Sequence, residues 1–329
     1  NNGGYGLDLP WGNVTDGLRN NLIEGNIIYQ NNNGIRIGTG NVYGDELPPK
    51  LSTVRKNIIV NNTNYGISTW ETYTNAYLKI ENNIIVTDKN NNAELVELTD
   101  EKGAIFKNNT LINLSDDENQ IGKALFAFLD GYVDNELKSN SIVNNTFIIK
   151  NRDGIQSFYG GNTFNNNNFI NRSKDNSKIY TVKIYGEDDN IFENNYWGTT
   201  TESEIQALIY DKYDDFELGE VDYDPYLSGL DSDAPISPPI NLTKASSGSD
   251  VVLSWTANSE SDVAGYKLYY GNPTGYSYDN SLDLGKVTTY TVSGGDINTE
   301  YAITAYDSSI DGTDDQVDGN ESWFSVTRS

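Results

Sequence analysis

The first two-thirds of the chain repeats one pattern of apolar and polar positions. An apolar residue is followed by two variable residues, an asparagine, one variable residue and a second apolar residue, as in Ile80, Asn83 and Ile85. The asparagines of this pattern are Asn26, Asn57, Asn83, Asn109, Asn145, Asn167 and Asn195. Successive asparagines are 31, 26, 26, 36, 22 and 28 residues apart. Because solenoid repeats span ~20–50 residues, the pattern predicts stacked coils, with insertions in the longer units.

Each position of the repeat has a physical interpretation. Strand side chains alternate between the two faces, so we expect the flanking apolar residues to point inward. Asparagine is expected at a corner because it tolerates the left-handed backbone region, and the amides of successive coils can form a ladder. A second motif follows most asparagine turns: a small residue and then an apolar–variable–apolar strand, at residues 34–37, 66–69 and 154–157. Residues 181–184 fit without the glycine. Together these motifs predict parallel strands around a narrow apolar core.

This repeat resembles the right-handed parallel β-helix of the pectate-lyase-like superfamily, and we assign residues 1–227 to such a solenoid. The segment 194–198, an acidic helix expected over 201–210 and the Asp-Pro-Tyr sequence at 224–226 resemble the C-terminal cap of many bacterial secreted β-helix proteins. Residues 1–9 match the second half of a repeat, so the chain is expected to start in mid-coil. Either upstream sequence or a protein partner would then cover that end.

The pattern changes after residue 227. Residues 228–239 are rich in Ser, Gly, Asp and Pro and are predicted to be a linker. Residues 240–329 contain short alternating strands separated by turns, which is typical of a β-sandwich. Trp255 on the second strand, Tyr266 on the third and Tyr301 on the sixth resemble a fibronectin type III module. That resemblance implies that Trp255 lies in the core and Tyr301 at a corner, so the whole chain is predicted to be all-β.

Composition narrows the range of functions. The formal net charge is -26, from 48 acidic and 22 basic residues, which disfavours nucleic acid and anionic membrane surfaces as partners. The absence of Cys and His excludes disulfides, thiol chemistry, Ser-His-Asp hydrolysis and His-ligated zinc. No stretch approaches the ~18 apolar residues that would predict membrane insertion. Any catalysis would therefore use carboxylates, Lys, Arg or Tyr. The resemblance to secreted bacterial β-helix proteins implies an extracellular or cell-surface location.

Enzymes of the pectate-lyase-like superfamily bind sugar chains across one parallel sheet, so the resemblance implies a similar face here. The comparable outward positions are Asp8, Arg36, Ser68, Gln156 and Lys183. Because stacked strands are ~4.8 Å apart, one side chain per coil comes near the repeat of a sugar ring. Aromatic rings offer flat faces to pyranoses, and polar groups bond to hydroxyls. The residues expected to contact sugar are Asp8, Trp70, Gln156, Tyr159 and Tyr185. Alternatively, this face is merely solvated, and Asp8 and Arg36 form a surface ion pair.

A lyase would need a base to remove the proton beside a uronate carboxylate, and a cation to neutralise that carboxylate. Arg36 or Lys183 could serve as the base if its pKa were depressed. Calcium could be the cation, and its candidate ligands are Glu94, Glu97 and Asp130. A weaker candidate calcium site contains Asp311, Asp314 and Asp315, in a loop that could equally be solvated.

Three functions therefore stay open. The leading hypothesis is a secreted or cell-surface protein that binds extracellular polysaccharide. The first alternative is a calcium-assisted polysaccharide lyase, and the second is a structural stalk, adhesin or assembly subunit. A hydrolase would need two carboxylates at a set separation, and the clustered Asp residues plus His of polygalacturonase-like enzymes cannot be assembled in a chain without His.

Overall fold

The structure is a computed structural model that describes residues 4–9, 21–38, 51–70, 77–87, 94–99, 101–117, 123–129, 139–173, 179–271, 278–307 and 321–325. The chain divides into two compact units, Asn1–Ala234 and Pro235–Ser329. Among the helices of the described segments, none is long and apolar enough to cross a membrane.

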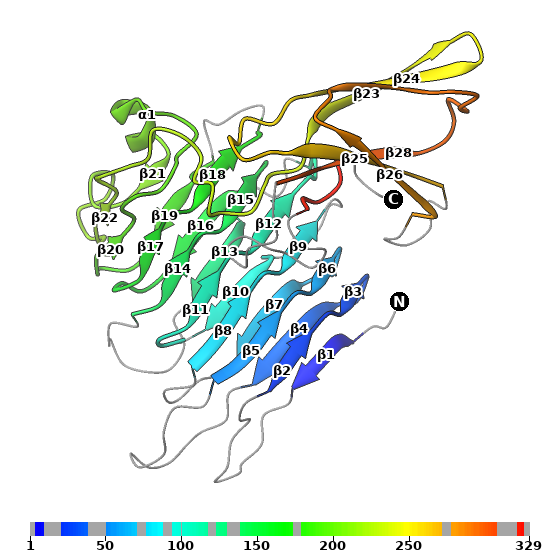
Figure 1. Ribbon diagram of the computed structural model, residues 1–329. Helices are drawn as coiled ribbons and strands as arrows, with labels where there is room; N and C mark the ends of the chain where they lie inside the picture. Colours follow the sequence, from blue (N-terminus) through cyan, green and yellow to red (C-terminus); the bar gives the residue numbers. More distant parts are fainter. Residues whose placement is uncertain are drawn as a thin grey trace. The chain divides into compact units, whose positions relative to one another are not determined.

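The first unit is a parallel β-solenoid whose described strands form three sheets, here named A, B and C (Figure 1). Sheet A contains β1 (Tyr5–Leu9), β4 (Asn33–Gly38), β7 (Tyr65–Trp70), β10 (Val96–Thr99), β13 (Ala124–Leu129), β16 (Asp153–Ser157), β19 (Val182–Ile184) and β21 (Ile209–Tyr210). Sheet B contains β2 (Leu22–Glu24), β5 (Leu51–Arg55), β8 (Tyr77–Glu81), β11 (Ile105–Lys107), β14 (Ser141–Val143), β17 (Thr163–Asn165), β20 (Asn190–Ile191) and β22 (Val221–Asp222). Sheet C contains β3 (Ile27–Tyr29), β6 (Ile58–Val60), β9 (Ile84–Thr87), β12 (Thr110–Asn113), β15 (Thr146–Ile149) and β18 (Asn168–Asn171). The predicted parallel β-helix is thus confirmed at the level of a parallel solenoid.

Register between coils places like residues above one another. In sheet A, Ile35 of β4 is the partner of Ile67 in β7, and Ile67 is the partner of Val96 in β10. All three side chains are fully buried. Further along the solenoid, the core becomes aromatic, and the rings of Phe164 and Phe192 stack with centroids 4.0 Å apart. Each coil alone could not bury its apolar side, so the stacking of coils creates the core.

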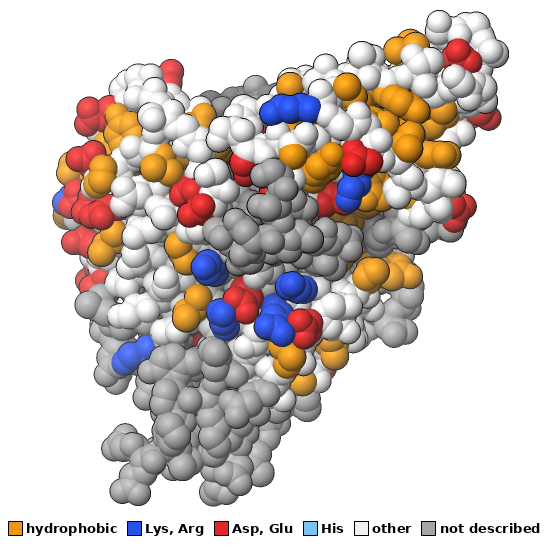
Figure 2. Space-filling view, viewed as in Figure 1, with side chains coloured by type: hydrophobic (Ala, Val, Ile, Leu, Met, Phe, Trp, Pro, Cys, Tyr) orange, Lys and Arg blue, Asp and Glu red, His pale blue; other side chains and the backbone are white. Residues whose placement is uncertain are grey.

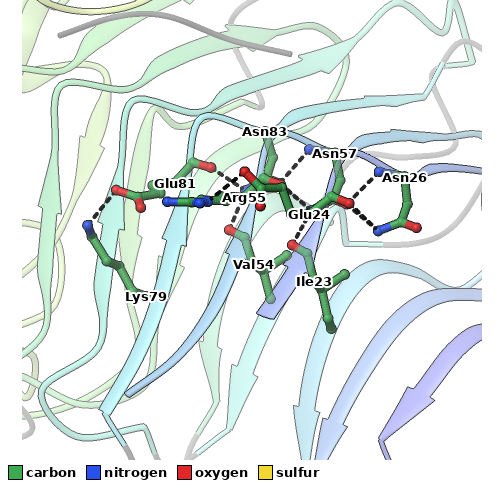
Figure 3. Close-up of polar contacts among 9 residues, drawn as sticks. All are labelled: Ile23, Glu24, Asn26, Val54, Arg55, Asn57, Lys79, Glu81 and Asn83. Carbon is green, nitrogen blue, oxygen red and sulfur yellow. Dashed lines mark hydrogen bonds and ion pairs between the residues drawn. The ribbon is translucent and has the colours of Figure 1, made fainter. Parts of the chain in front are cut away.

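The asparagines of the repeat form a continuous hydrogen-bonded ladder, as predicted. Asn57 Nδ2 donates to Asn83 Oδ1 (3.0 Å), and Asn83 Nδ2 donates to Asn109 Oδ1 (2.9 Å). The ladder asparagines also bond to backbone; for example, Asn83 Nδ2 donates to the carbonyl of Val54 in the preceding coil (Figure 3). Bonds of the same kind join Asn26 to Asn57 and continue through Asn145, Asn167 and Asn195. The ladder therefore satisfies buried polar groups and fixes the register between coils.

The residue that makes the left-handed turn at each corner is not the ladder asparagine that the sequence predicted. None of the ladder asparagines has a positive φ; the residue before each one does, including Gly25 (68°), Lys56 (54°) and Asn82 (57°). The ladder side chain must point inward to stack, as shown by the complete burial of Asn83. The preceding residue therefore makes the left-handed turn that redirects the chain between sheets B and C.

The C-terminal end of the solenoid is covered by a short cap. Helix α1 spans Glu202–Gln206, shorter than the predicted 201–210, because Ile209 and Tyr210 pair with β19 as strand β21. Ile205 is fully buried and joins the solenoid core. Farther along the chain, the backbone N–H of Asp231 donates to Asn168 Oδ1 (2.8 Å). The chain beyond β22 thus stays bonded to the coils.

The second unit contains two antiparallel sheets that share one apolar core. Their strands are β23 (Ile240–Ser247), β24 (Asp250–Thr256) and β27 (Thr289–Val292) in one sheet, and β26 (Asn280–Gly285), β25 (Gly265–Tyr270) and β28 (Tyr301–Tyr306) in the other. Trp255 packs edge-on against Tyr266 in this core, with centroids 5.5 Å apart. Tyr301 is buried, and its hydroxyl donates to the carbonyl of Asp296 (3.2 Å). The predicted core and corner roles are confirmed, and the sheets are compatible with a sandwich.

Candidate functional site

The outer side of sheet A carries one continuous row of facing positions. The row consists of Asp8, Arg36, Ser68, Glu97, Ala127, Gln156, Lys183 and Tyr210, each the backbone partner of the next. We call it the sheet A row. It brings together the five outward positions that the sequence predicted, and it adds Glu97, Ala127 and Tyr210. Adjacent members are one strand spacing apart, ~4.8 Å.

At the N-terminal end of the row, Arg36 is fixed by two contacts. Its Nε and Nη2 donate to Asp8 Oδ1 (2.9 Å) and Oδ2 (2.8 Å), and its guanidinium lies 4.0 Å from the ring centroid of Tyr5. The hydrogen bond to Asp8, opposed by partial burial, raises the pKa of Arg36. A catalytic base would need the opposite shift. Arg36 is therefore a paired cation, as in the surface ion-pair interpretation.

The centre of the row holds a half-buried carboxyl group, that of Glu97. Burial raises its pKa to about 7, and the negative charge of Glu94 adds to this effect. A hydrogen bond with Tyr65 and the positive charge of Lys123 lower the pKa of Glu97, but by less than burial raises it. The Lys123 ammonium contacts Glu94 Oε1 at 3.4 Å. Glu97 therefore changes its charge near neutral pH.

Two neighbours complete the electrostatics of this centre. Burial, followed by the charges of Glu97 and Glu94, raises the pKa of Tyr65 to about 12, so the phenol stays protonated. Arg152 is fully buried, and burial lowers its pKa to about 10 against the attraction of Glu94. The sequence drew attention to Glu94 and Glu97 as calcium ligands but not to Tyr65. No spacing rule connects Tyr65 with Glu97, because they come from different coils.

The predicted calcium sites are only partly covered by the structure. The side chain of Trp70 and the residues Asp130, Asp311, Asp314 and Asp315 lie outside the described part. Within the described ranges, no group of three or more acidic side chains is arranged to hold a metal ion. Glu94 instead faces Lys123, and Glu97 bonds with Tyr65. Among the described residues, Glu94 and Glu97 therefore do not form the predicted calcium site by themselves, and calcium binding stays a prediction.

The C-terminal end of the row is rich in tyrosine. The Lys183 ammonium lies 5.0 Å from the ring centroid of Tyr185, 5.1 Å from that of Tyr210 and 5.8 Å from that of Tyr180. Among the residues that the structure describes, no carboxylate lies within ion-pair distance of Lys183. Burial lowers its pKa, but the hydrogen bond to Tyr185 and nearby negative groups, including Asp153, outweigh this effect and leave the pKa raised. Lys183 is thus a cation and is not suited to act as a base.

Beside Lys183, two partly exposed aromatic rings stack face to face. The rings of Phe158 and Tyr185 stack with centroids 4.4 Å apart and planes 10° apart. Their exposed fractions are 37% and 39%, and we call this pair the aromatic platform. Tyr159, by contrast, is only 7% exposed and packs against Phe128 in the core. Its predicted place on the outer face is wrong, because neighbouring side chains point to opposite sides and Phe158 takes the outer one.

Gln156 and Asp153 lie between the platform and the centre of the row. Gln156 is buried, and its Nε2 donates to Asp153 Oδ2 (2.9 Å). Burial raises the pKa of Asp153, opposed by a backbone hydrogen bond from Tyr180. The structure therefore places Gln156 in the predicted row, but with its amide directed to Asp153.

The cap contains a cavity of about 560 Å³ with many acidic side chains. Its acidic lining residues are Glu202, Asp211, Asp214, Glu220, Asp222 and Asp224. Figure 2 shows acidic side chains gathered at the left, where Figure 1 places α1 and β22. Asp211 has a structural role, since its oxygens accept bonds from the backbone N–H groups of Tyr213 (3.0 Å) and Val221 (2.9 Å).

Sheet B presents a different outer face, where charges pair with each other. Arg55 Nε contacts Glu24 Oε1 at 3.0 Å, and Lys79 Nζ contacts Glu81 Oε2 at 2.6 Å (Figure 3). Figure 2 shows a similar mixture of positive and negative side chains near the middle of the viewed face. Such pairs contribute ~0–1 kcal/mol each, so the outer face of sheet B is a solvated surface of paired charges.

Comparison with known proteins adds no assignment: no protein-family model matches the chain, and no curated protein matches it.

Proposed function

We propose that this protein binds extracellular polysaccharide along the outer face of sheet A. In this proposal the solenoid is a right-handed β-helix of the pectate-lyase-like type, the second unit is a fibronectin type III spacer, and the protein is secreted or displayed on a cell surface. The observation that carries the proposal is the aromatic platform of Phe158 and Tyr185, with the Lys183 ammonium beside it.

The platform has the properties that a sugar ring requires. Two rings stacked face to face, each more than one-third exposed, leave apolar surface against which the C–H face of a pyranose can pack. Because these rings are exposed, they contribute little to the packing of the apolar core, which lies on the opposite side of the sheet. The row is spaced at ~4.8 Å per step. Next to the platform Lys183 and Tyr210 are partly exposed, whereas Ala127 and Gln156 are buried.

The local cation Lys183 favours an acidic sugar unit at the platform, against the long-range repulsion that the net negative charge exerts on a polyanion. The chain carries a net charge of -26, and the ion pairs of Arg36, Arg55 and Lys79 show how acidic residues neutralise cations on the solenoid. Lys183 instead lies among tyrosine rings. An ammonium held this way can pair with a carboxylate or sulfate of a sugar, and at such a partly shielded position the pairing is stronger than in open water.

Titration calorimetry against alginate, polygalacturonate, hyaluronan and dextran tests this proposal. We expect binding to an acidic polymer that weakens with salt. We expect Tyr185→Ala to weaken binding about tenfold, equivalent to ~1.4 kcal/mol, and Lys183→Gln to reduce the preference for acidic over neutral polymer. Tyr213→Ala is the matched control, because Tyr213 is 78% exposed but lies in the cap.

Two results would overturn the proposal. One is the absence of binding to every polymer of the panel at neutral pH and low salt. The other is equal loss of binding in Tyr185→Ala and Tyr213→Ala, which would show that the contact is not made by the aromatic platform. A folded protein that binds none of these polymers would direct attention to the structural alternative, a stalk or assembly subunit.

A further inference from the structure

The cap of the solenoid contains a cavity that the proposed function does not use. Its lining comes from α1, from the chain that runs from β21 to β22, and from the residues directly after β22. At about 560 Å³, the cavity has the size of pockets that hold small molecules. None of its lining residues belongs to the sheet A row. Figure 2 shows acidic and hydrophobic side chains intermixed at the left, where Figure 1 places α1 and β22.

Hydrogen bonds hold the walls of this cavity in place. The backbone N–H of Lys212 donates to the carbonyl of Gly219 (3.1 Å) and closes the loop between β21 and β22. On the other side, Gln206 Nε2 of α1 donates to the hydroxyl of Tyr223 (3.1 Å), just after β22. A pocket whose walls are already fixed loses little conformational freedom when a ligand enters, which favours binding.

The lining already holds one ammonium group, which belongs to the chain itself. Lys212 Nζ contacts Glu220 Oε2 and lies 5.2 Å from the ring centroid of Tyr213. The Tyr213 hydroxyl donates to the other oxygen of Glu220 (3.1 Å). Both Glu220 and Tyr213 line the cavity. A carboxylate combined with an aromatic face is a favourable environment for an organic cation, so this part of the wall indicates the ligand chemistry.

Three other carboxylates of the lining have no cation beside them. They belong to Glu202, Asp222 and Asp224. Within the segments that the structure describes, no ion pair or hydrogen bond involves these three carboxylates. All three residues are exposed. Because like charges around one cavity repel each other, a cation that enters the cavity relieves this repulsion.

The spread of these carboxylates favours an elongated cation over a metal ion. Among the described residues, no three acidic side chains come together closely enough to hold a metal. The lining also includes apolar surface, from the exposed Ala207 and the half-buried ring of Tyr223. A ligand that suits such a wall has separate positive groups joined by hydrocarbon segments.

We propose that the cap cavity binds a small aliphatic polyamine of the chemical class of spermidine. Its ammonium groups pair with Glu202, Asp222 and Asp224, and its methylene segments pack against Ala207 and the Tyr223 ring. This site is independent of the polysaccharide face, because the two share no residue.

Equilibrium dialysis of the intact protein against labelled spermidine, at neutral pH and low salt, tests the proposal. We expect one bound spermidine per chain, with an affinity that falls as salt is added. The double substitution of Asp222→Asn and Asp224→Asn should weaken binding about tenfold. Glu217→Gln is the matched control and should stay within twofold, because Glu217 is an exposed acid of the same loop that does not line the cavity. If circular dichroism shows that the double variant is unfolded, Glu202→Gln takes its place, with an expected loss of at least threefold.

Competition with unlabelled ligands identifies the source of the cation. We expect spermidine to displace the label at lower concentrations than magnesium chloride or acetylated trilysine amide. Stronger displacement by magnesium would assign the cavity to a metal ion, and stronger displacement by trilysine would assign it to a lysine-rich protein segment. Either result overturns the polyamine site. The absence of spermidine binding also overturns it, as does equal affinity in the double variant and Glu217→Gln, which would mean that the net charge of -26 attracts polycations without a site.

Discussion

The outer faces of sheets A and B are built on the same coils, yet they use their side chains differently. On sheet B, charges of opposite sign alternate and pair, as Glu24 does with Arg55. On sheet A, a carboxyl group is partly buried at Glu97, a cation lies among aromatic rings at Lys183, and the platform rings are exposed. Stability alone explains the arrangement of sheet B, because paired and solvated charges cost little. On sheet A, burial opposes the charged form of Glu97, and perturbed carboxyl groups of this kind cluster at functional sites.

The largest expected effect concerns the framework that the two faces share. Asn109→Ala removes the acceptor of Asn83 Nδ2 and of its backbone N–H, and also removes the donor to Asn145. Because each buried group left without a partner costs ~1–3 kcal/mol, we expect the free energy of unfolding to fall by about 4 kcal/mol. Urea denaturation of the intact chain measures this loss.

Asn26→Ala is the matched control for the ladder, because Asn26 is the first ladder asparagine of the described residues. Its side chain donates to Asn57 Oδ1 and to the exposed carbonyl of Glu24. We expect a loss of about 1 kcal/mol there. Equal losses at Asn26 and Asn109 would contradict the view that interior ladder positions hold the coils in register.

The second prediction separates the two faces by pH. The ordinary pKa of Glu97 is 4.5 and the folded value is about 7. Between these values the folded state holds the proton more tightly than the unfolded state, so the free energy of unfolding falls as pH rises. Below pH 4.5 the effect vanishes, and above pH 7 it is complete. With allowance for partial exposure, we expect Glu97→Gln to stabilise the protein by about 2 kcal/mol at pH 8 and by nothing at pH 4.

Urea denaturation of Glu97→Gln and Glu24→Gln at pH 4 and pH 8 measures the change in the free energy of unfolding on each face. Glu24 is exposed and paired on sheet B, so its substitution should change stability by less than ~1 kcal/mol. A stabilisation of Glu97→Gln at pH 4 equal to that at pH 8 would show that the effect has another cause than the charge of Glu97.

The repeat made most of the solenoid predictable. Asparagine spacing located the ladder, and flanking apolar residues such as Ile80 and Ile85 located the core, because both depend on a period that stacking imposes on every coil. The outward row was also predictable, since it follows from strand alternation. The left-handed corner residue was not, because the sequence at that position varies between Gly25, Lys56 and Asn82.

The chemistry of the site was less predictable, since it depends on contacts between coils. Tyr65 and Glu97 become neighbours only when two strands of sheet A stack. Tyr159 was assigned to the wrong side, because an aromatic pair at the end of a strand can place either ring outward. Burial, which sets the pKa of Glu97, also has no signal in the local sequence.

The smallest predicted effect compares one arginine on each face. Arg36 forms a bidentate pair with Asp8 and lies over the Tyr5 ring, whereas Arg55 contacts Glu24 through Nε. Lysine keeps the charge but cannot form the planar fork or stack as well. We therefore expect Arg36→Lys to lower the free energy of unfolding by about 1 kcal/mol, and Arg55→Lys to leave it unchanged within ~0.3 kcal/mol. Denaturation at low and high salt measures both, and a larger loss at Arg55 would mean that sheet B charges are fixed structural contacts and that the contrast between the two faces does not hold.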